Sequence, residues 1–196
     1  MLVKLYGENP SERELQRIVG ALERGELIVY PTDSVYAAGC SVRAPRAIEQ
    51  LRRLKGDGSL TAVFGSIAQV AEYCRVDNAA FRVLKRNLPG PFTFVLPASS
   101  HLPDKALGRR KTIGIRIPAH PVARAIVGAL GAPLLTASLK DEEQEYTTDP
   151  ELIHERFGHA VAIVVDGGPG ATEPTTVVDL TDGEPEIVRE GKGILQ

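Results

Sequence analysis

The heptapeptide Tyr30-Pro31-Thr32-Asp33-Ser34-Val35-Tyr36 follows residues 27–30, an apolar run of the kind that forms a buried strand. Ligands of open α/β sheets bind at such strand ends, where Thr32 and Ser34 would offer hydroxyls and Asp33 a carboxylate. The same three side chains also suit an Asx or Ser/Thr turn, in which they bond to the local backbone. The segment therefore predicts either the edge of a ligand site or a structural turn.

Helical and strand patterns alternate along the chain outside this segment. Ser11 and Glu14 have the spacing of a capping box at the start of the first helix. Apolar spacing and cap residues predict helices over residues 11–24, 45–55, 77–88, 121–130 and 149–157, with a short helix after Ser66. Apolar runs predict strands over residues 27–30, 60–64, 92–96, 112–117, 134–137, 161–165, 176–180 and 187–189. This order predicts an α/β fold around a mixed sheet, and a single domain over residues 1–196 because no linker divides the chain.

Charge is distributed unevenly along the chain. The net charge is −2, yet residues 43–124 hold 15 Lys and Arg against 5 Asp and Glu, while the rest holds 8 against 20. This asymmetry predicts a basic surface for an anionic partner, such as nucleotide phosphate or RNA. Alternatively, basic helix faces pair with acidic ones across the fold. Charge alone leaves both interpretations open.

Composition and cysteine content indicate the cellular compartment of the protein. The 196 residues are 43% apolar, which is enough for one packed core. No apolar run reaches the length of about 20 residues that spans a bilayer, and residues 1–10 lack the pattern of a secretory signal. Two unclustered cysteines, Cys40 and Cys74, are typical of a reducing compartment. We therefore expect a cytoplasmic protein with no membrane partner, and the sequence leaves its oligomeric state open.

Several common site signatures are absent. The sequence has no G-x-x-x-x-G-K-[ST] phosphate loop and no G-x-G-x-x-G after a strand. Its four histidines lack metal-ligand spacing with the cysteines, so no metal-binding residue is predicted. The run Gly167-Gly168-Pro169-Gly170 could cradle phosphate, although a tight turn after a strand is the favoured interpretation.

The heptapeptide is the first of five segments that occur in a recognisable order. The others are LKG at 54–56, PGPFTFVL at 89–96, TIGIRIPAHP at 112–121, and PTTVVDL at 174–180 with VREG at 188–191. Together they resemble the P-T-[DE]-T-V-Y-G, lysine, P-G-P-x-T-x-V-L, T-x-G-x-R-x-P-x-H-P and P-S-T-V-V-D…R-x-G segments of the threonylcarbamoyl-AMP synthase family, which has the YrdC-like fold. The resemblance extends over residues 10–193.

The resemblance implies a fold, a reaction and a set of site residues. It implies a large twisted sheet with a basic concave face, and a reaction of ATP, threonine and bicarbonate, with Mg²⁺, that gives threonylcarbamoyl-AMP and pyrophosphate for modification of adenosine 37 in tRNA. The substrate threonine would contact Thr32, Arg116 and Thr136. The ATP-binding residues would be Lys55, Thr112, Ser138, Thr175 and Arg189, with Lys55 and Ser138 catalytic. Arg116 suits this role because a guanidinium can pair bidentately with a carboxylate.

Two positions depart from the pattern of the active synthases. Those proteins carry K-x-R in the lysine segment and S-x-N after the later strand, whereas here the third residues are Asp57 and Lys140. These departures and the stretch VDNAAFR at 76–82 resemble the YciO-type branch of the family. The alternative function is therefore a catalytically weak or inactive module of the same fold that binds tRNA or double-stranded RNA.

Overall fold

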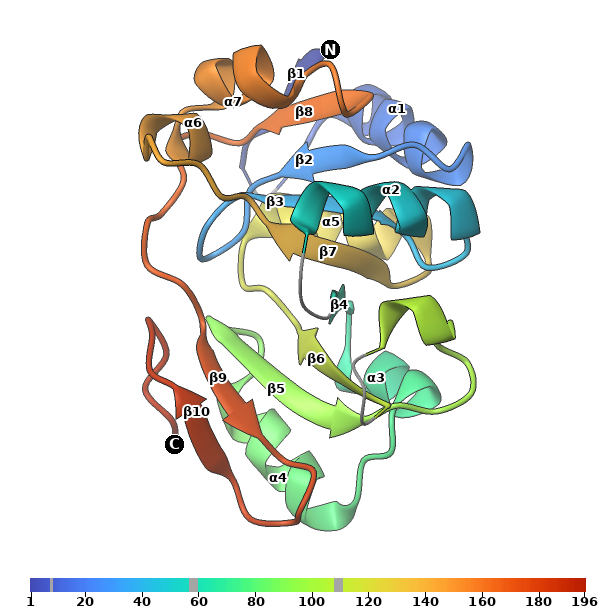
Figure 1. The fold of residues 1–196 in the computed structure, drawn as a ribbon, viewed down its shortest axis with the longest axis vertical. Helices are drawn as coiled ribbons and strands as arrows, with labels where there is room; N and C mark the ends of the chain where they lie inside the picture. The colour runs from blue at the N-terminus through green and yellow to red at the C-terminus, as the bar shows by residue number, and fades with distance from the viewer. Residues whose placement is uncertain (8, 57–59, 108–110) are drawn as a thin grey trace.

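The computed structural model describes residues 1–7, 9–56, 60–107 and 111–196, which form an α/β fold around one twisted mixed sheet (Figure 1). The sheet has the strand order β1-β8-β2-β3-β7-β4-β6-β5-β9-β10. The strands are β1 (Leu2–Lys4), β2 (Ile28–Tyr30), β3 (Ala37–Ser41), β4 (Thr61–Val63), β5 (Phe92–Pro97), β6 (Thr112–Arg116), β7 (Leu134–Ser138), β8 (Ile163–Asp166), β9 (Thr176–Asp179) and β10 (Glu186–Arg189). Parallel and antiparallel pairs both occur, so the predicted mixed sheet is confirmed.

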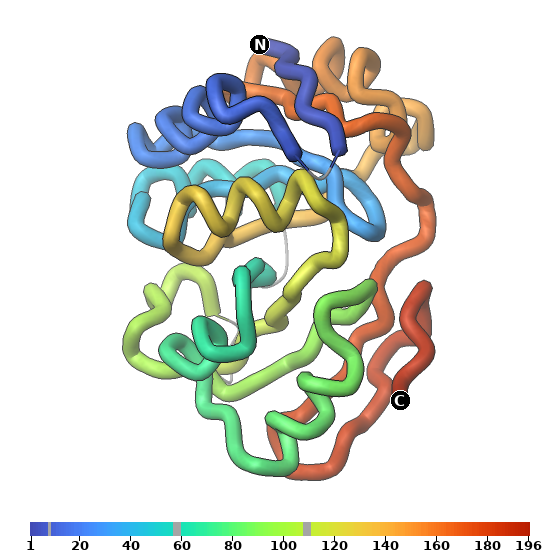
Figure 2. Tube along the Cα trace, turned by 180° about the vertical axis from the view of Figure 1, so that it is seen from behind, coloured from blue at the N-terminus to red at the C-terminus, as the bar shows by residue number. Residues whose placement is uncertain are grey.

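Helices cover the two faces of the sheet unequally. They are α1 (Glu12–Glu23), α2 (Pro45–Lys55), α3 (Ile67–Tyr73), α4 (Asn78–Asn87), α5 (Pro121–Leu130), α6 (Glu145–Thr148) and α7 (Pro150–Phe157), with a 3₁₀ turn η1 (Asp104–Ala106). Helix α2 packs on β3 and β7 on the near side of Figure 1, whereas α1, α5, α3 and α4 lie on the side that faces the viewer in Figure 2. Among the described residues, the near face of the lower strands carries no helix (Figure 1). No helix of the described chain has the length and apolar character needed to cross a membrane.

Cap residues set several helix boundaries as predicted, with one exception. The Ser66 hydroxyl accepts a hydrogen bond from the Gln69 amide at 3.1 Å, and the Asp77 carboxylate accepts one from the Ala80 amide at 2.7 Å. The capping box at Ser11 is wrong, because the Ser11 side chain forms no cap hydrogen bond. The other partner of that box, Glu14, forms a salt bridge with Arg17 one turn later. This salt bridge takes the place of the reciprocal cap.

The sequence patterns did not predict β1 and β3. Strand β3 is central, between β2 and β7, yet its sequence AAGCS lacks the β-branched and aromatic residues typical of strands. The reason is packing: a Cβ at Gly39 would lie only 2.9 Å from the Tyr30 ring, so bulk on β2 requires small residues on β3. Strand β1 is short, and it becomes a strand only by pairing with β8 from the far end of the chain.

Both cysteines lie in the core and are unpaired. Burial raises the pKa of the Cys40 and Cys74 thiols to about 12 in each case. Because the thiolate is the reactive form, neither thiol of the native protein should react with Ellman's reagent at neutral pH within minutes. Both should react once the chain is unfolded in guanidinium. Rapid labelling of the native protein would contradict this placement.

Candidate functional site

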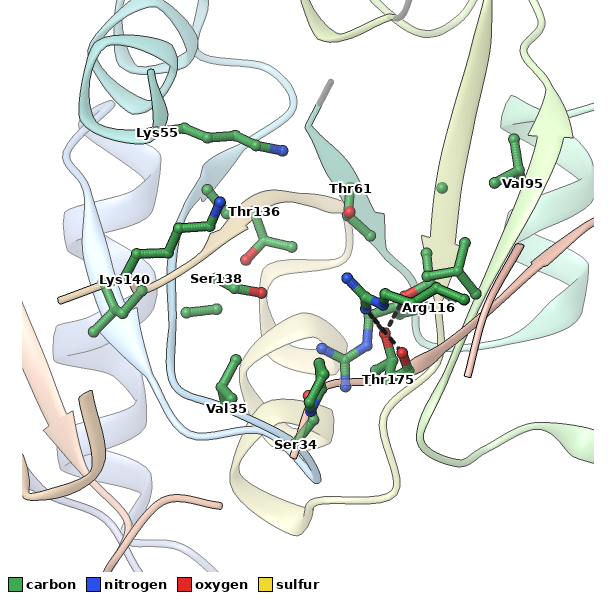
Figure 3. Close-up of a pocket in the computed structure, with 18 of the residues that line it drawn as sticks. Ser34, Val35, Lys55, Thr61, Val95, Arg116, Thr136, Ser138, Lys140 and Thr175 are labelled. Carbon is green, nitrogen blue, oxygen red and sulfur yellow. Dashed lines mark hydrogen bonds between the residues drawn. The ribbon is translucent and has the colours of Figure 1, made fainter. Parts of the chain in front are cut away.

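A cavity of about 460 Å³ lies over the helix-free face of the sheet, between the end of α2 and strands β4–β7, β9 and β10 (Figure 3). This volume is in the range of small-molecule sites. Its described lining includes four cationic side chains and eight hydroxyls, and no carboxylate. The cations are Lys55, Arg116, Lys140 and Arg189, and the hydroxyls are those of Ser34, Thr61, Thr93, Thr112, Thr136, Ser138, Thr172 and Thr175.

The alternation of side chains along strands builds this lining. In β6, Thr112, Gly114 and Arg116 line the cavity together with the mostly buried Ile113, whereas Ile115 is buried in the core and is not part of the lining. A Cβ at Gly114 would lie 2.7 Å from the Thr93 methyl group, so glycine keeps the cavity floor open there. The same period of two puts Thr93 and Val95, and Thr175 and Val177, on the cavity side, whereas the successive residues Thr136, Ala137 and Ser138 of β7 all belong to the lining. The alternation within TIGIR and FTFVL could have identified Gly114 and Thr93 as lining residues, whereas Thr61 belongs to β4 and lies outside both stretches.

Seven of the eight site residues predicted from the sequence line this one cavity; the exception is Thr32. The Thr32 hydroxyl accepts a hydrogen bond from the Ser34 amide at 3.1 Å and donates one to the Val35 carbonyl at 2.8 Å. The heptapeptide is therefore a Ser/Thr turn at this residue. Its hydroxyl also lies 3.5 Å from the Arg116 guanidinium. The structure thus places the Thr32 hydroxyl next to the Arg116 guanidinium, and its contact with threonine stays a prediction.

Arg116 and Asp33 form a buried ion pair at the base of the cavity. The guanidinium Nη2 lies 2.5 Å from Asp33 Oδ1, with side-chain exposures of 6% and 12%. Asp33 Oδ2 accepts a hydrogen bond from the Ala119 amide at 2.9 Å, so both carboxylate oxygens are engaged. Arg116 Nε is buried and has no hydrogen-bond partner among the described residues. The pair joins the heptapeptide to the end of β6 and leaves one buried donor of Arg116 unsatisfied.

The hydroxyl of Thr136 has a defined direction. It donates to the Ala38 carbonyl at 2.9 Å and accepts from the buried Tyr30 hydroxyl at 3.2 Å. Because a hydroxyl has one proton and two lone pairs, Thr136 keeps one acceptor site for a ligand donor. Burial, the largest influence, raises the pKa of Tyr30, so the phenol stays protonated and continues to donate.

Thr175 and Arg189 meet at the opposite wall. Arg189 Nη2 donates to the Thr175 carbonyl at 2.8 Å, and the Thr175 hydroxyl lies 2.8 Å from that of Thr93. The chain then folds back so tightly that a Cβ at Gly191 would lie 2.4 Å from the Pro174 carbonyl oxygen. Glycine at residue 191 therefore allows the C-terminal segment to support this wall.

Replacing Gly191 with alanine is expected to lower the free energy of unfolding by roughly 1–3 kcal/mol, because the new methyl group must displace backbone atoms. Urea unfolding measures the change. Gly128→Ala is the control, since that position lies within α5 and a Cβ there has nothing within 4 Å. The control should be neutral or stabilising by up to about 1 kcal/mol. Equal stabilities of the Gly191→Ala protein and the parent would refute the packing argument.

Lys55 and Ser138 enter the cavity from the last residues of α2 and β7. Burial, followed by repulsion from Lys140 and Arg52, lowers the pKa of Lys55. Ser138 and Lys140 are exposed at the cavity mouth. The sequence departure at Asp57 and the basic residues 109–110 lie outside the described residues.

The glycine-rich run after β8 is a structural turn, as favoured from the sequence. The Gly167 amide donates to the Tyr36 hydroxyl at 3.2 Å, and the Gly168 amide donates to the Asp166 carboxylate at 3.0 Å. The Tyr36 hydroxyl in turn donates to the Gly168 carbonyl at 2.7 Å. These amides are therefore used within the turn, and the four residues of the run are not part of the cavity lining.

Pairing across the fold does not account for the basic stretch. Between pairs of described residues, the salt bridge of Arg116 with Asp33 is the one that joins residues 43–124 to a carboxylate outside that stretch. Lys105 pairs with Glu49, which lies within the stretch. The alternative of extensive basic–acidic pairing is therefore wrong for this part of the chain.

The described residues of the cavity do not form a site for a resident metal ion. No group of three or more His, Cys, Asp or Glu residues converges in the described chain. The cavity lining there offers hydroxyls and cations but no carboxylate, the ligand that usually holds Mg²⁺ on a protein.

Comparisons with known proteins agree with this architecture. The Sua5/YciO/YrdC family model, described as "Telomere recombination", matches residues 20–191. Uncharacterized protein YciO of Escherichia coli is 41% identical, over 96% of this chain and 94% of its own. A threonylcarbamoyl-AMP synthase of Xanthomonas axonopodis is 33% identical, over 87% of this chain and 95% of its own.

Solved structures show the same fold. The crystal structure of E. coli YciO superposes with a TM-score of 0.93 at 39% identity, covering 99% of this chain and 97% of that one. P. abyssi Sua5 complexed with L-threonine gives a TM-score of 0.86 at 24% identity, covering 97% of this chain and 57% of that one. The chain therefore belongs to the Sua5/YciO/YrdC family and is a YrdC-like protein of the YciO type.

Proposed function

We propose that this protein is a threonylcarbamoyl-AMP synthase, which converts ATP, threonine and bicarbonate to threonylcarbamoyl-AMP and pyrophosphate for modification of adenosine 37 in tRNA. The cavity carries this proposal, because four cations and eight hydroxyls converge in about 460 Å³ with no carboxylate among the described lining residues. Such a lining suits a polyphosphate ligand. The Xanthomonas synthase, 33% identical to this chain, supports the same reaction class.

The reaction needs positive charge where pyrophosphate leaves. The threonine amine adds to the bicarbonate carbon with loss of water, and a carbamate oxygen then attacks the α-phosphorus. The bond from that phosphorus to the bridging oxygen breaks, and pyrophosphate carries away the electron pair. Lys55 would offset the developing charge, with Ser138 as a hydrogen-bond donor beside it. Thr112, Thr175 and Arg189 would hold the rest of the nucleotide.

The threonine substrate would bind at the base of the cavity. A carboxylate on Arg116 Nε would satisfy the buried donor that has no partner among the described residues. The free lone pair of Thr136 could accept from the substrate amine. Thr32 and Asp33 would then position Arg116, because they contact its guanidinium directly.

Release of pyrophosphate tests this function. We expect the purified protein to release pyrophosphate from ATP only when threonine and bicarbonate are both present. Release that is independent of threonine would instead indicate simple ATP hydrolysis.

A second candidate is an RNA-binding module, which is favoured by the excess of 15 Lys and Arg over 5 Asp and Glu in residues 43–124. Binding of tRNA or double-stranded RNA to it should weaken steeply with salt, because the complex releases condensed counterions. RNA binding that stays intact in Arg116→Ala, together with no pyrophosphate release by the parent, would favour this second candidate.

A further inference from the structure

The chain after β10 is fixed beside the cavity through its backbone. The Lys192 amide donates to the Pro174 carbonyl at 2.9 Å. The buried Thr176 hydroxyl accepts from the Gly191 amide at 3.1 Å and donates to the Gly193 carbonyl at 2.6 Å. Lys192 is therefore held at its own amide and at both of its neighbours, so its side chain leaves the backbone from a defined point.

The side chain of Lys192 connects this segment to the heptapeptide at residues 30–36. Its ammonium group donates to the Asp33 carbonyl at 2.8 Å, across 159 residues of sequence. The heptapeptide leads from β2 to β3, whereas Lys192 follows β10, the last strand in the order of the sheet. Both segments lie on the same side of the molecule in Figure 1 and in Figure 2. One lysine side chain thus links two distant parts of the sheet.

This contact fixes the peptide unit between Asp33 and Ser34. The carbonyl of Asp33 and the amide of Ser34 belong to one planar unit. Lys192 donates to the carbonyl, and the Ser34 amide donates to the Thr32 hydroxyl at 3.1 Å. Because hydrogen bonds at both ends restrict rotation of the unit, the Lys192 contact restrains the turn that carries the Asp33 carboxylate.

The Asp33 carboxylate in turn determines where Arg116 lies. One of its oxygens pairs with the Arg116 guanidinium, and the other accepts from the Ala119 amide. Neither Lys192 nor Asp33 belongs to the described lining of the cavity, whereas Arg116 does. Lys192 therefore acts on the cavity through Asp33 and Arg116, at the end where Arg116 Nε is buried without a partner among the described residues.

We infer that Lys192 is a positioning residue for Arg116, which it orients through the turn at Asp33. The inference rests on the proposed function, in which Arg116 binds the carboxylate of threonine. It adds the segment after β10 to the parts of the chain on which binding of the amino acid depends. Lys192 is exposed, and holding its flexible stem in one geometry costs side-chain entropy. Its contact should therefore affect ligand affinity more than global stability.

Isothermal titration separates positioning from a general structural role. Lys192→Met should weaken binding of L-threonine roughly three- to tenfold, the usual effect of losing one hydrogen bond. Binding of ATP should change less than about twofold, because its predicted contacts do not include Arg116. Lys192→Arg keeps a donor and should restore most of the threonine affinity. Lys85→Met, at an exposed lysine of α4, should bind both ligands like the parent.

Hydrogen exchange of the protein without ligands tests the contact independently of the proposed function. Lys192→Met should speed exchange of the Ser34 and Ala119 amides roughly three- to tenfold, because the acceptors of both amides belong to the turn that Lys192 restrains. The Ile153 amide of α7, which donates to the Asp149 carbonyl, should exchange as in the parent.

The outcomes separate the role of Lys192 from the synthase reaction. Parent-like exchange of both amides in Lys192→Met would overturn the inference even if the protein makes threonylcarbamoyl-AMP. Faster exchange with unchanged threonine affinity would also overturn it, because the turn would then not govern Arg116. Faster exchange with a selective loss of threonine affinity that Lys192→Arg restores would support it, whether or not synthesis is detected. A parent protein without affinity for threonine would contradict the proposed function itself, and the inference with it.

Discussion

Removing the Asp33 carboxylate is expected to lower the free energy of unfolding by about 3–5 kcal/mol, the usual cost of leaving a buried charge without its partner. Arg116 is 5% exposed, and its guanidinium lies 2.5 Å from Asp33. Asp33→Ala would also remove the acceptor of the Ala119 amide. For a chain of this size, the loss corresponds to a fall in melting temperature of roughly 6–20 °C.

The double variant Asp33→Leu/Arg116→Met separates the buried charge from other effects. Replacing both partners of a buried pair with apolar residues is often close to neutral, so the double variant should recover most of the stability lost in Asp33→Ala. Unfolding in urea, followed by circular dichroism, measures all three proteins. A loss below about 1 kcal/mol in Asp33→Ala would show that the charge is not buried as described.

The second large effect is expected at Lys55. Lys55→Met should lower the rate of threonylcarbamoyl-AMP formation by roughly 10²–10³-fold, as removal of one positioned donor to a developing charge commonly does. Lys85→Met should retain full activity, since Lys85 is exposed on α4.

The lowered pKa of Lys55 also predicts a pH dependence. An anionic substrate binds the protonated amine, so Lys55-dependent activity should be full below this lowered pKa and lost as the pH rises through it. Removing Lys140 takes away a repelling charge and should move this loss of activity, the alkaline limb of the pH–activity profile, to higher pH. An alkaline limb that is unchanged in Lys55→Met would assign the titration to another group.

Where local signals determine structure, the sequence predicted it well. Helices α2 and α5 have the predicted bounds, because each begins with a proline at its first turn and ends at a glycine. The caps at Ser66 and Asp77 also formed. Strand β3 was not predicted, because its residues are small to leave room for the Tyr30 ring of the neighbouring strand. The local sequence of β3 contains no sign of this contact.

In the candidate site, too, some features could be predicted from local sequence and others depend on contacts in the folded chain. The motif segments predicted which residues gather, since Lys55, Thr112 and Arg189 do line one cavity although they are far apart in the sequence. They did not predict that Asp33 would pair with Arg116, and they left the turn at Thr32 as one of two interpretations. Both contacts depend on how close the heptapeptide lies to the end of β6, a distance that only the folded chain defines.

Mass spectrometry for threonylcarbamoyl-AMP tests the central claim most directly. The protein is incubated with ATP, Mg²⁺, threonine and isotopically labelled bicarbonate, beside a synthase that carries the full K-x-R and S-x-N pattern. We predict that labelled threonylcarbamoyl-AMP forms, that omission of any substrate prevents it, and that Lys55→Met sharply reduces it. No product from this protein while the control synthase is active would contradict the proposed function.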